Sequence, residues 1–146
     1  MKTAPPENPK IYHILHMGNH PSLKYRGGQR PIVHLQADLR EAIGWADANG
    51  RRWAISDRNA GTYVAEFYND LAGLANVDWQ AVNSSDFRDP FVKEGKQAEF
   101  LMHDWFPWEL IERIGVIDQQ MNAQAEEAIG EADHKPLVMV EHGWYY

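Results

Sequence analysis

The sequence contains no cysteine among its 146 residues. This absence excludes disulfide bonds, a thiolate nucleophile and any metal or iron–sulfur site with cysteine ligands. Long apolar runs are missing as well, since none approaches the roughly 20 residues that a membrane-spanning helix needs. The opening residues, MKTAPPENPK, are polar and proline-containing where a secretory signal would be apolar. We therefore expect a cytoplasmic protein with no membrane association.

Positive charge is also scarce, because 21 acidic residues outnumber 14 basic ones and leave a net charge of −7. The excess is uneven: residues 94–146 hold 3 Lys or Arg against 11 Asp or Glu, whereas residues 1–93 hold 11 against 10. The N-terminal part can therefore still offer a basic face to nucleic acid, which binds largely through its phosphates. Arginines there alternate with Tyr25, Trp45 and Trp53, a combination that suits single-stranded DNA. The alternative is a solvated surface over ordinary core aromatics.

Strand and helix patterns are interleaved along the chain, and no internal repeat is found. Several connections between strands are too short for a helical crossover, which favours a mixed sheet over a doubly wound one. We predict an α+β (mixed α/β) fold, a single domain with a mixed central sheet. The predicted strands are residues 11–17, 31–36, 53–56, 96–102, 113–117 and 136–140. The predicted helices are 39–48, 64–71, a short turn in 77–82, one opening at 105–108, and 118–133, with a loop over 83–95.

Motifs for well-known chemistries are few. His13, His16 and His20 form an H-x2-H-x3-H cluster, but in a strand the first two point to opposite faces. No nearby Asp, Glu or Cys completes a ligand set, so we expect no metal site. Neither a G-x-S-x-G elbow nor a phosphate-binding loop nor a dinucleotide fingerprint is present.

The most specific chemical feature is the pair Gln97 and Glu99 in the apolar segment KQAEFLM. On a strand these two side chains would project from the same face. A carboxylate can stabilise the positive charge that develops at a sugar anomeric carbon, and an amide beside it can orient the incoming nucleophile. The competing interpretation is an exposed sheet face on which Glu99 pairs with Lys96 or an arginine.

Several segments of the sequence resemble the DarT family of DNA ADP-ribosyltransferase toxins. They are PKIYHI, YRGGQRPIVHL, the SDRNA turn, DWQAV, KQAEFLMHDWFPWELIERIGV and the terminal WYY, and they occur in the family's order. The match runs almost without interruption from Tyr25 to Tyr146. The resemblance implies the ADP-ribosyltransferase fold and cleavage of NAD as a co-substrate. It further implies transfer of ADP-ribose to a base, usually thymidine, in single-stranded DNA.

The resemblance also assigns residues. Glu99 corresponds to the catalytic glutamate of the QAEF strand, with Gln97 beside it, and residues 56–99 correspond to the substrate-binding loop. NAD binding is expected at the remnant of a Y-H-I-T-H motif, which consists of Tyr12, His13 and Ile14. DNA binding is expected at the loop, through Arg58, Asn59 and Lys96. A macrodomain antitoxin of the DarG type is the expected protein partner, beside single-stranded DNA.

One departure from the family pattern lies between about residues 17 and 24. Family members carry several dozen residues there, including an arginine used in NAD handling, whereas here only nine positions lead from His16 to Tyr25. Arg26 and Arg30 are the candidate replacements. Two other functions therefore stay open: a relic that binds single-stranded DNA or an antitoxin without catalysis, and a hydrolase that transfers ADP-ribose to water.

Overall fold

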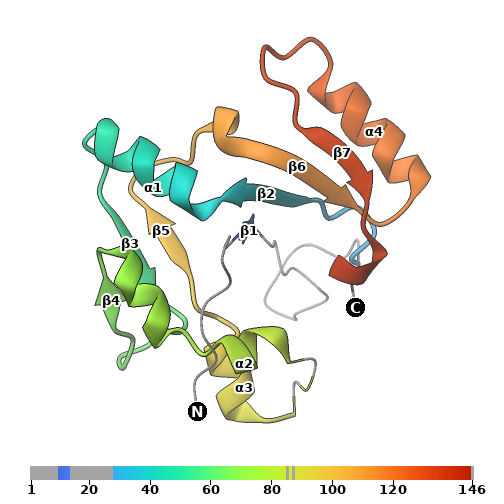
Figure 1. Cartoon of the computed structure of the whole chain (residues 1–146). Helices are drawn as coiled ribbons and strands as arrows, with labels where there is room; N and C mark the ends of the chain where they lie inside the picture. Colours follow the sequence, from blue (N-terminus) through green and yellow to red (C-terminus); the bar gives the residue numbers. More distant parts are fainter. Residues whose placement is uncertain (1–9, 14–27, 85, 87, 146) are drawn as a thin grey trace. The chain divides into compact units, whose positions relative to one another are not determined.

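The computed structural model describes residues 10–13, 28–84, 86 and 88–145 (Figure 1). The chain divides into two compact units. One contains the described residues of Ile43–Phe106, and we call it the inserted unit. The other consists of Lys10–Ala42 and Pro107–Tyr146, and we call it the split unit because the inserted unit interrupts it in the sequence.

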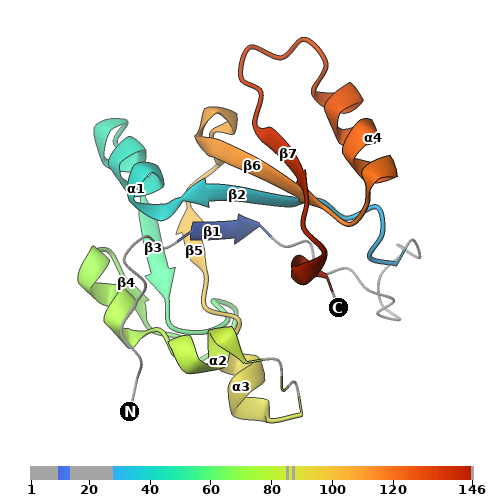
Figure 2. The ribbon, with the colours of Figure 1, turned by 45° about the vertical axis from the view of Figure 1, so that its right-hand side comes forward.

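The split unit contains a four-stranded sheet in the order β1-β2-β6-β7 (Figures 1 and 2). Strand β1 pairs antiparallel with β2, β2 pairs antiparallel with β6, and β6 pairs parallel with β7, so the mixed sheet predicted from the connections is confirmed. The parallel pair is joined by helix α4, which packs against both of its strands. The bounds are β1 Lys10–His13, β2 His34–Asp38, β6 Ile111–Val116, α4 Gln119–Ile129 and β7 Leu137–Val140.

The C-terminal residues are fastened to this sheet. The Tyr145 hydroxyl donates to the backbone carbonyls of Ile32 and Gly115, at 2.7 and 3.1 Å. Trp144, in the short 3-10 helix η3 (His142–Trp144), lies so close to Gly115 that a Cβ there would come within 2.3 Å of the indole ring. Position 115 therefore needs glycine because the indole occupies the space of a side chain.

Helix α1 (Leu39–Ala48) follows the sequence prediction at both of its ends. The Asp38 carboxylate accepts hydrogen bonds from the backbone N–H groups of Arg40 and Glu41, at 2.8 and 3.3 Å, as a helix N-cap does. At the other end Gly50 has a φ of 63°, the left-handed conformation in which helices often stop. The apolar face is buried through Leu39, Ala42, Ile43 and Ala46.

The inserted unit contains a separate three-stranded antiparallel sheet in the order β4-β3-β5. The strands predicted at 53–56 and 96–102 thus form a sheet of their own instead of joining the mixed one. Short helices follow β4, and α2 packs against α3. The bounds are β3 Trp53–Ser56, β4 Phe67–Tyr68, η1 Leu71–Asn76, α2 Trp79–Asn83, α3 Pro90–Gly95 and β5 Phe100–Met102, and η2 (Trp108–Leu110) then opens the second half of the split unit.

Two predictions for the inserted unit are wrong. The helix expected over 64–71 is absent, because Phe67 and Tyr68 pair with Ser56 and Ile55 as β4. The loop expected over 83–95 contains α3, whose first turn is capped by Asp89 with Pro90 as its first residue. The strand expected over 96–102 is shorter than predicted, since regular pairing begins at Phe100.

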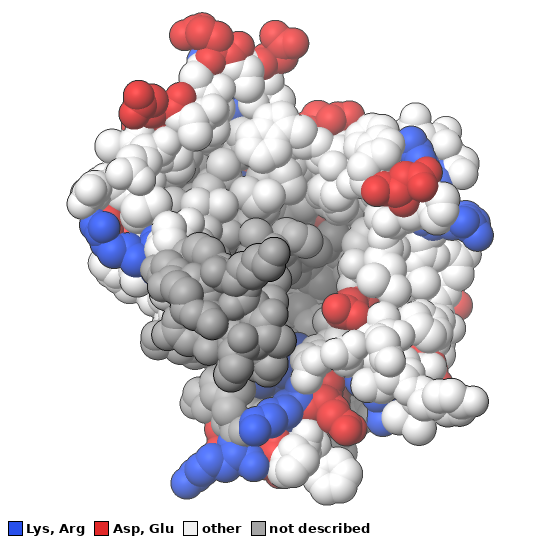
Figure 3. Space-filling view, turned by 180° about the vertical axis from the view of Figure 1, so that it is seen from behind, with Lys and Arg blue, Asp and Glu red and all other residues white. Residues whose placement is uncertain are grey.

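Charge is unevenly distributed over the face seen in Figure 3. Acidic side chains gather at the top of that view. Helix α4 and the loop after it carry the exposed Glu126, Glu127, Glu131 and Asp133. At the bottom, basic and acidic side chains lie beside one another. Among the helices of the described residues, none has the length and apolar character to cross a membrane.

Candidate active site

Glu99 directly precedes β5 and is fixed to the end of β3. The Ser56 N–H donates to the Glu99 carbonyl at 2.8 Å, and the Glu99 N–H donates to Ser56 Oγ at 3.1 Å. Ser56 is fully buried, and its hydroxyl donates in turn to the Arg58 carbonyl at 2.6 Å. The backbone of Glu99 is therefore held rigidly, while its side chain is exposed.

The turn that follows β3 binds the side chains of both Gln97 and Glu99. The Ala60 N–H donates to Glu99 Oε2 at 2.8 Å, and the Asn59 side-chain amide donates to Gln97 Oε1 at 2.6 Å. The Gly61 N–H donates back to Asn59 Oδ1 at 2.8 Å and closes an Asx turn. We call residues 59–61 the clamp turn.

Gln97 lies in a different secondary-structure element from the one that the sequence predicts. It lies in the turn after α3 and not on the strand, so the alternation that put it on one strand face with Glu99 does not apply. Its Nε2 instead donates to the Lys93 carbonyl near the C-terminal end of α3, at 3.0 Å. Gln97 and Glu99 nevertheless share the clamp turn as a binding partner, so the amide and the carboxylate do converge.

Asp57 and Arg58 form an ion pair immediately before the clamp turn. Arg58 Nη2 and Nε donate to Asp57 Oδ2 at 2.7 and 3.1 Å, and the Glu66 N–H donates to Asp57 Oδ1 at 3.0 Å. The guanidinium hydrogen bonds lower the pKa of Asp57, against the opposing effect of burial. Asp57 is thus a buried, ionised anchor, and part of the charge of Arg58 is neutralised locally.

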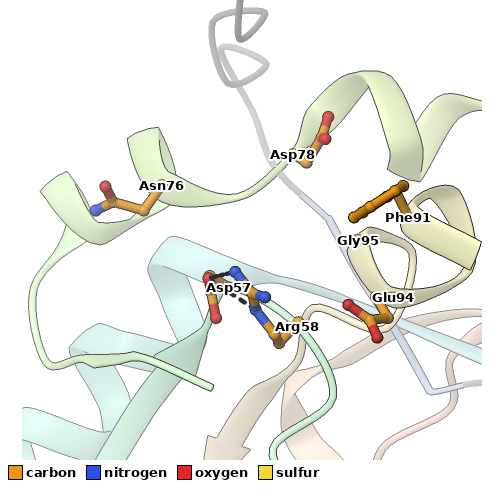
Figure 4. Close-up of a pocket in the computed structure, with 7 residues that line it drawn as sticks. All are labelled: Asp57, Arg58, Asn76, Asp78, Phe91, Glu94 and Gly95. Atoms are coloured by element: carbon orange, nitrogen blue, oxygen red, sulfur yellow. Dashed lines mark hydrogen bonds and ion pairs between the residues drawn. The ribbon is translucent and has the colours of Figure 1, made fainter. Parts of the chain in front are cut away.

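A pocket of about 150 Å³ opens beside this ion pair (Figure 4). Figure 4 shows Arg58 and Glu94 extending from one side, and Asp78 and Phe91 lying on the other. The Phe91 side chain is 82% exposed, which leaves an aromatic surface available at the rim. The lining residues are Asp57, Arg58, Asn76, Asp78, Phe91, Glu94 and Gly95, all within the inserted unit.

Comparison with known proteins identifies the family and the fold of the chain. The sequence profile of the family described as "ssDNA thymidine ADP-ribosyltransferase, DarT" matches residues 5–146. The chain belongs to this family. A "DNA ADP-ribosyl transferase" of Thermus aquaticus is 38% identical over 144 residues, which are 97% of this chain and 60% of that protein.

Two solved structures of a Thermus DarT have the same fold. "Thermus sp. 2.9 DarT in complex with ADP-ribosylated ssDNA" superposes with a TM-score of 0.77 at 33% identity, covering 86% of this chain and 59% of that one. "Thermus sp. 2.9 DarT in complex with NAD+" gives a TM-score of 0.77 at 33% identity, covering 86% of this chain and 63% of that one. The chain thus spans about three fifths of the length of these DarT proteins.

The loop residue Lys96, predicted to contact DNA, is engaged within the DarT fold itself. Its ammonium donates to the carbonyls of Val82 and Ser84, at 2.8 and 2.6 Å. Burial lowers the pKa of Lys96. The ammonium therefore ties the end of α2 to the segment that carries Gln97.

The residues that the DarT resemblance assigns to NAD lie in the split unit. Tyr12 and His13 are in β1, opposite Gln36 and Leu35 of β2, and Ile14 lies outside the described residues. The replacement candidate Arg30 is paired with Asp118 and Gln120, and Arg26 is also outside the described residues. His16 and His20 of the histidine cluster are outside as well, and the described residues contain no group of three His, Asp or Glu that could hold a metal ion.

Sequence reasoning missed two contributors to this candidate site. Asp57 was not singled out, although its place at the end of a buried strand and beside an arginine is a signal that could have found it. The Ala60 N–H was not singled out either, and a backbone donor has no residue-type signal. The Asn-x-Gly spacing at Asn59 and Gly61 would have indicated an Asx turn.

Proposed function

We propose that the chain is an NAD-dependent ADP-ribosyltransferase that modifies a thymidine base in single-stranded DNA. Its two units are then the parts of one ADP-ribosyltransferase domain, in a toxin-type enzyme that works in the cytoplasm. The observation that carries the proposal is the Glu99 carboxylate, which is held at Oε2 by the Ala60 N–H while the side chain stays exposed. Membership of the DarT family supports the same reaction.

The reaction breaks the glycosidic bond between the nicotinamide nitrogen and the anomeric carbon of its ribose. The bonding electrons leave with nicotinamide, which departs neutral, and positive charge develops on the ribose. A ring nitrogen of the base then bonds to the anomeric carbon and loses its proton to water. Glu99 stabilises the developing charge, because a fixed carboxylate in this position needs no reorganisation during the step.

The remaining assignments follow the family resemblance. We propose that NAD is bound near Tyr12 and His13 of β1, together with Ile14, which lies outside the described residues. Single-stranded DNA is then bound along the loop bearing Arg58, Asn59 and Lys96. Lys96 contributes by holding the segment that carries Gln97 in place. A DarG-like macrodomain antitoxin is the proposed protein partner, and the structure titled "Thermosipho africanus DarTG in complex with ADP-ribose" resembles this chain at the level of the fold.

The decisive test is Glu99→Gln, which removes the charge but keeps an oxygen for the Ala60 N–H. We expect the transfer rate to fall by about 10² to 10³, the effect of removing one preorganised electrostatic contact. Mass spectrometry of an oligonucleotide incubated with NAD measures the gain of one ADP-ribose mass. Glu109→Gln, in η2, is the matched control for the loss of one carboxylate and should transfer like the parent protein.

The outcomes separate the alternative functions. Transfer that continues unchanged in Glu99→Gln would remove Glu99 from the mechanism. NAD consumption without any DNA adduct would indicate a hydrolase. A folded protein that binds no NAD in calorimetry at millimolar concentration would instead be a non-catalytic DNA-binding or antitoxin-binding protein.

A further inference from the structure

The clamp turn connects two side-chain amides into a chain of hydrogen bonds with a fixed direction. At one end the Gly61 N–H donates to Asn59 Oδ1 at 2.8 Å. In the middle Asn59 Nδ2 donates to Gln97 Oε1 at 2.6 Å. At the other end Gln97 Nε2 donates to the Lys93 carbonyl at 3.0 Å.

The two ends of this chain determine how both amides are oriented. A backbone N–H can only donate, so Asn59 must turn its oxygen toward Gly61 and its nitrogen toward Gln97. A backbone carbonyl can only accept, so Gln97 must turn its nitrogen toward Lys93 and its oxygen toward Asn59. Rotation of either amide by 180° would place a donor against a donor at one of its contacts and an acceptor against an acceptor at the other. The observed orientation of both amides is therefore strongly preferred.

This orientation decides what the site presents to a bound molecule. The oxygen of Gln97 faces Asn59, and one of the two Nε2 hydrogens is directed to Lys93. Within the described part of the chain, the other Nε2 hydrogen and Glu99 Oε1 have no hydrogen-bond partner, and both side chains are exposed. The pair therefore offers one donor, from Gln97, and one anionic acceptor, from Glu99.

We propose that Asn59 is a positioning residue that makes Gln97 a hydrogen-bond donor, and that Gln97 selects the acceptor base through a carbonyl oxygen next to the reacting ring nitrogen. The inference rests on the proposed transfer to DNA and specifies how that same site recognises its base. A base edge with an amino group in that place would meet another donor and be rejected. Asn59 belongs to the loop proposed to bind DNA, and in this scheme it acts on the acceptor base through Gln97 and not by touching the base itself.

Asn59→Asp tests the positioning role. The carboxylate still accepts from the Gly61 N–H, but it cannot donate, so an oxygen of Asp would face the oxygen of Gln97. We expect transfer to thymidine to fall by about 10- to 100-fold, the effect of losing one well-made hydrogen bond to the reacting group. Hydrolysis of NAD without DNA should fall less than transfer does, because Glu99 keeps its own contact with Ala60.

A double-variant comparison shows whether the effect passes through Gln97. Gln97→Ala alone should lower transfer about as much as Asn59→Asp, and adding Asn59→Asp to Gln97→Ala should change transfer by less than about threefold further. Gln97→Glu leaves the clamp turn unaltered, keeps an oxygen for Asn59 and removes the donor. It therefore tests the same idea if Asn59→Asp fails to fold.

The recognised carbonyl is tested with oligonucleotides in which the target thymidine carries sulfur at position 2 or at position 4. Sulfur is a weak acceptor, so one of the two substitutions should lower transfer by the parent protein about tenfold. In Gln97→Ala the same substitution should have no more than about a threefold effect, and this comparison cancels any change in the reactivity of the base itself. Gln124→Glu, an exposed amide-to-carboxylate change on α4, controls for the added negative charge.

Three results would overturn the proposal while leaving the proposed function intact. They are equal losses of transfer and hydrolysis in Asn59→Asp, additive effects of Asn59→Asp and Gln97→Ala, and equal effects of sulfur in both proteins. Failure of the proposed function is distinguishable, because the parent protein would then modify none of the oligonucleotides.

Discussion

Single residues of the candidate site differ in how far their roles follow from residue type. Glu99 could be found from the sequence, because a carboxylate in an apolar segment needs a purpose or a partner. Asn59 was assigned to DNA binding, and its contact with Gln97 could not be anticipated because the two are 38 positions apart. The Ala60 N–H has no side-chain signal at all. Residue type therefore identifies the carboxylate proposed to react, and only the fold identifies which groups hold it in place.

The Asp57–Arg58 pair makes stability depend on pH in a defined direction. The pKa of Asp57 is lowered by Arg58 from its ordinary value of 3.8. Its contribution is therefore complete above that ordinary value and is lost as the pH falls through the lowered one. We expect Asp57→Asn to reduce the free energy of unfolding by about 1–2 kcal/mol at pH 7, and by much less at pH 2.5. Urea unfolding at the two pH values measures both differences.

Asp133→Asn is the control for this experiment, since Asp133 is exposed in the loop after α4. It should leave the free energy of unfolding nearly unchanged at both pH values. An Asp57→Asn effect of the same size at pH 2.5 as at pH 7 would show that packing, and not the ion pair, is responsible.

Helices and strands match the sequence prediction where several local features of the sequence indicate the same element. The helix after Asp38 had a capping carboxylate, an apolar period and a glycine stop, and it is confirmed as α1. The helix predicted over 64–71 relied on an apolar spacing alone, and strand β4 replaces it. Two residues of strand are too short to show a period, and their pairing with β3 is not local in the sequence.

Helix α3 was missed even though its first two residues carried a signal. Asp89 accepts from the Phe91 N–H at 2.8 Å, and Pro90 occupies the first helical position. An Asp-Pro pair is typical of a helix N-terminus, because proline has no N–H that would need a partner there. The short length of the helix hid it, since six residues do not establish an apolar face.

The contact between α2 and α3 depends on the absence of a side chain at Gly95. A Cβ added there would lie 2.6 Å from Ala81 Cβ, which belongs to α2 and cannot move aside on its own. We expect Gly95→Ala to lower the free energy of unfolding by about 1–3 kcal/mol through this overpacking. Thermal or urea unfolding followed by circular dichroism provides the measurement.

Gly44 offers a matched control within α1. It is also a helical glycine, but a Cβ there meets nothing within 4 Å. Gly44→Ala should therefore stabilise the protein by about 0.5–1 kcal/mol, the ordinary difference in helix propensity. If both substitutions shifted stability in the same direction, steric contact with Ala81 would not be the cause at Gly95.

The net charge of the chain constrains the proposed binding of DNA. The chain carries a net charge of −7, and the two cationic side chains assigned to the DNA loop, Arg58 and Lys96, already contact protein oxygens. Long-range attraction to phosphate is therefore weak, and stacking and base contacts must supply the affinity. We expect log affinity to fall with log salt concentration with a slope no steeper than about −2, since each phosphate contact on a single strand contributes about −0.7.

Fluorescence anisotropy with a labelled single-stranded oligonucleotide between about 50 and 300 mM salt measures this slope, over a range in which exposed charges are progressively screened. Glu126→Gln combined with Glu127→Gln should raise affinity slightly at the low end of that range and leave it unchanged at the high end. A slope near −5 would contradict the expectation and indicate an extensive phosphate-binding surface.

The contact between the Ala60 amide and Glu99 turns one backbone proton into a reporter on the reaction. The Ala60 N–H has its hydrogen bond with the carboxylate that we propose to be catalytic, and not with another strand. Its exchange with deuterated solvent, and its NMR shift, therefore follow the position of that carboxylate. If the proposed reaction draws Glu99 toward a bound ribose, this amide is expected to exchange faster while the amides of β3 do not. Substrate binding could then be observed on the protein itself, without a label and before any product forms.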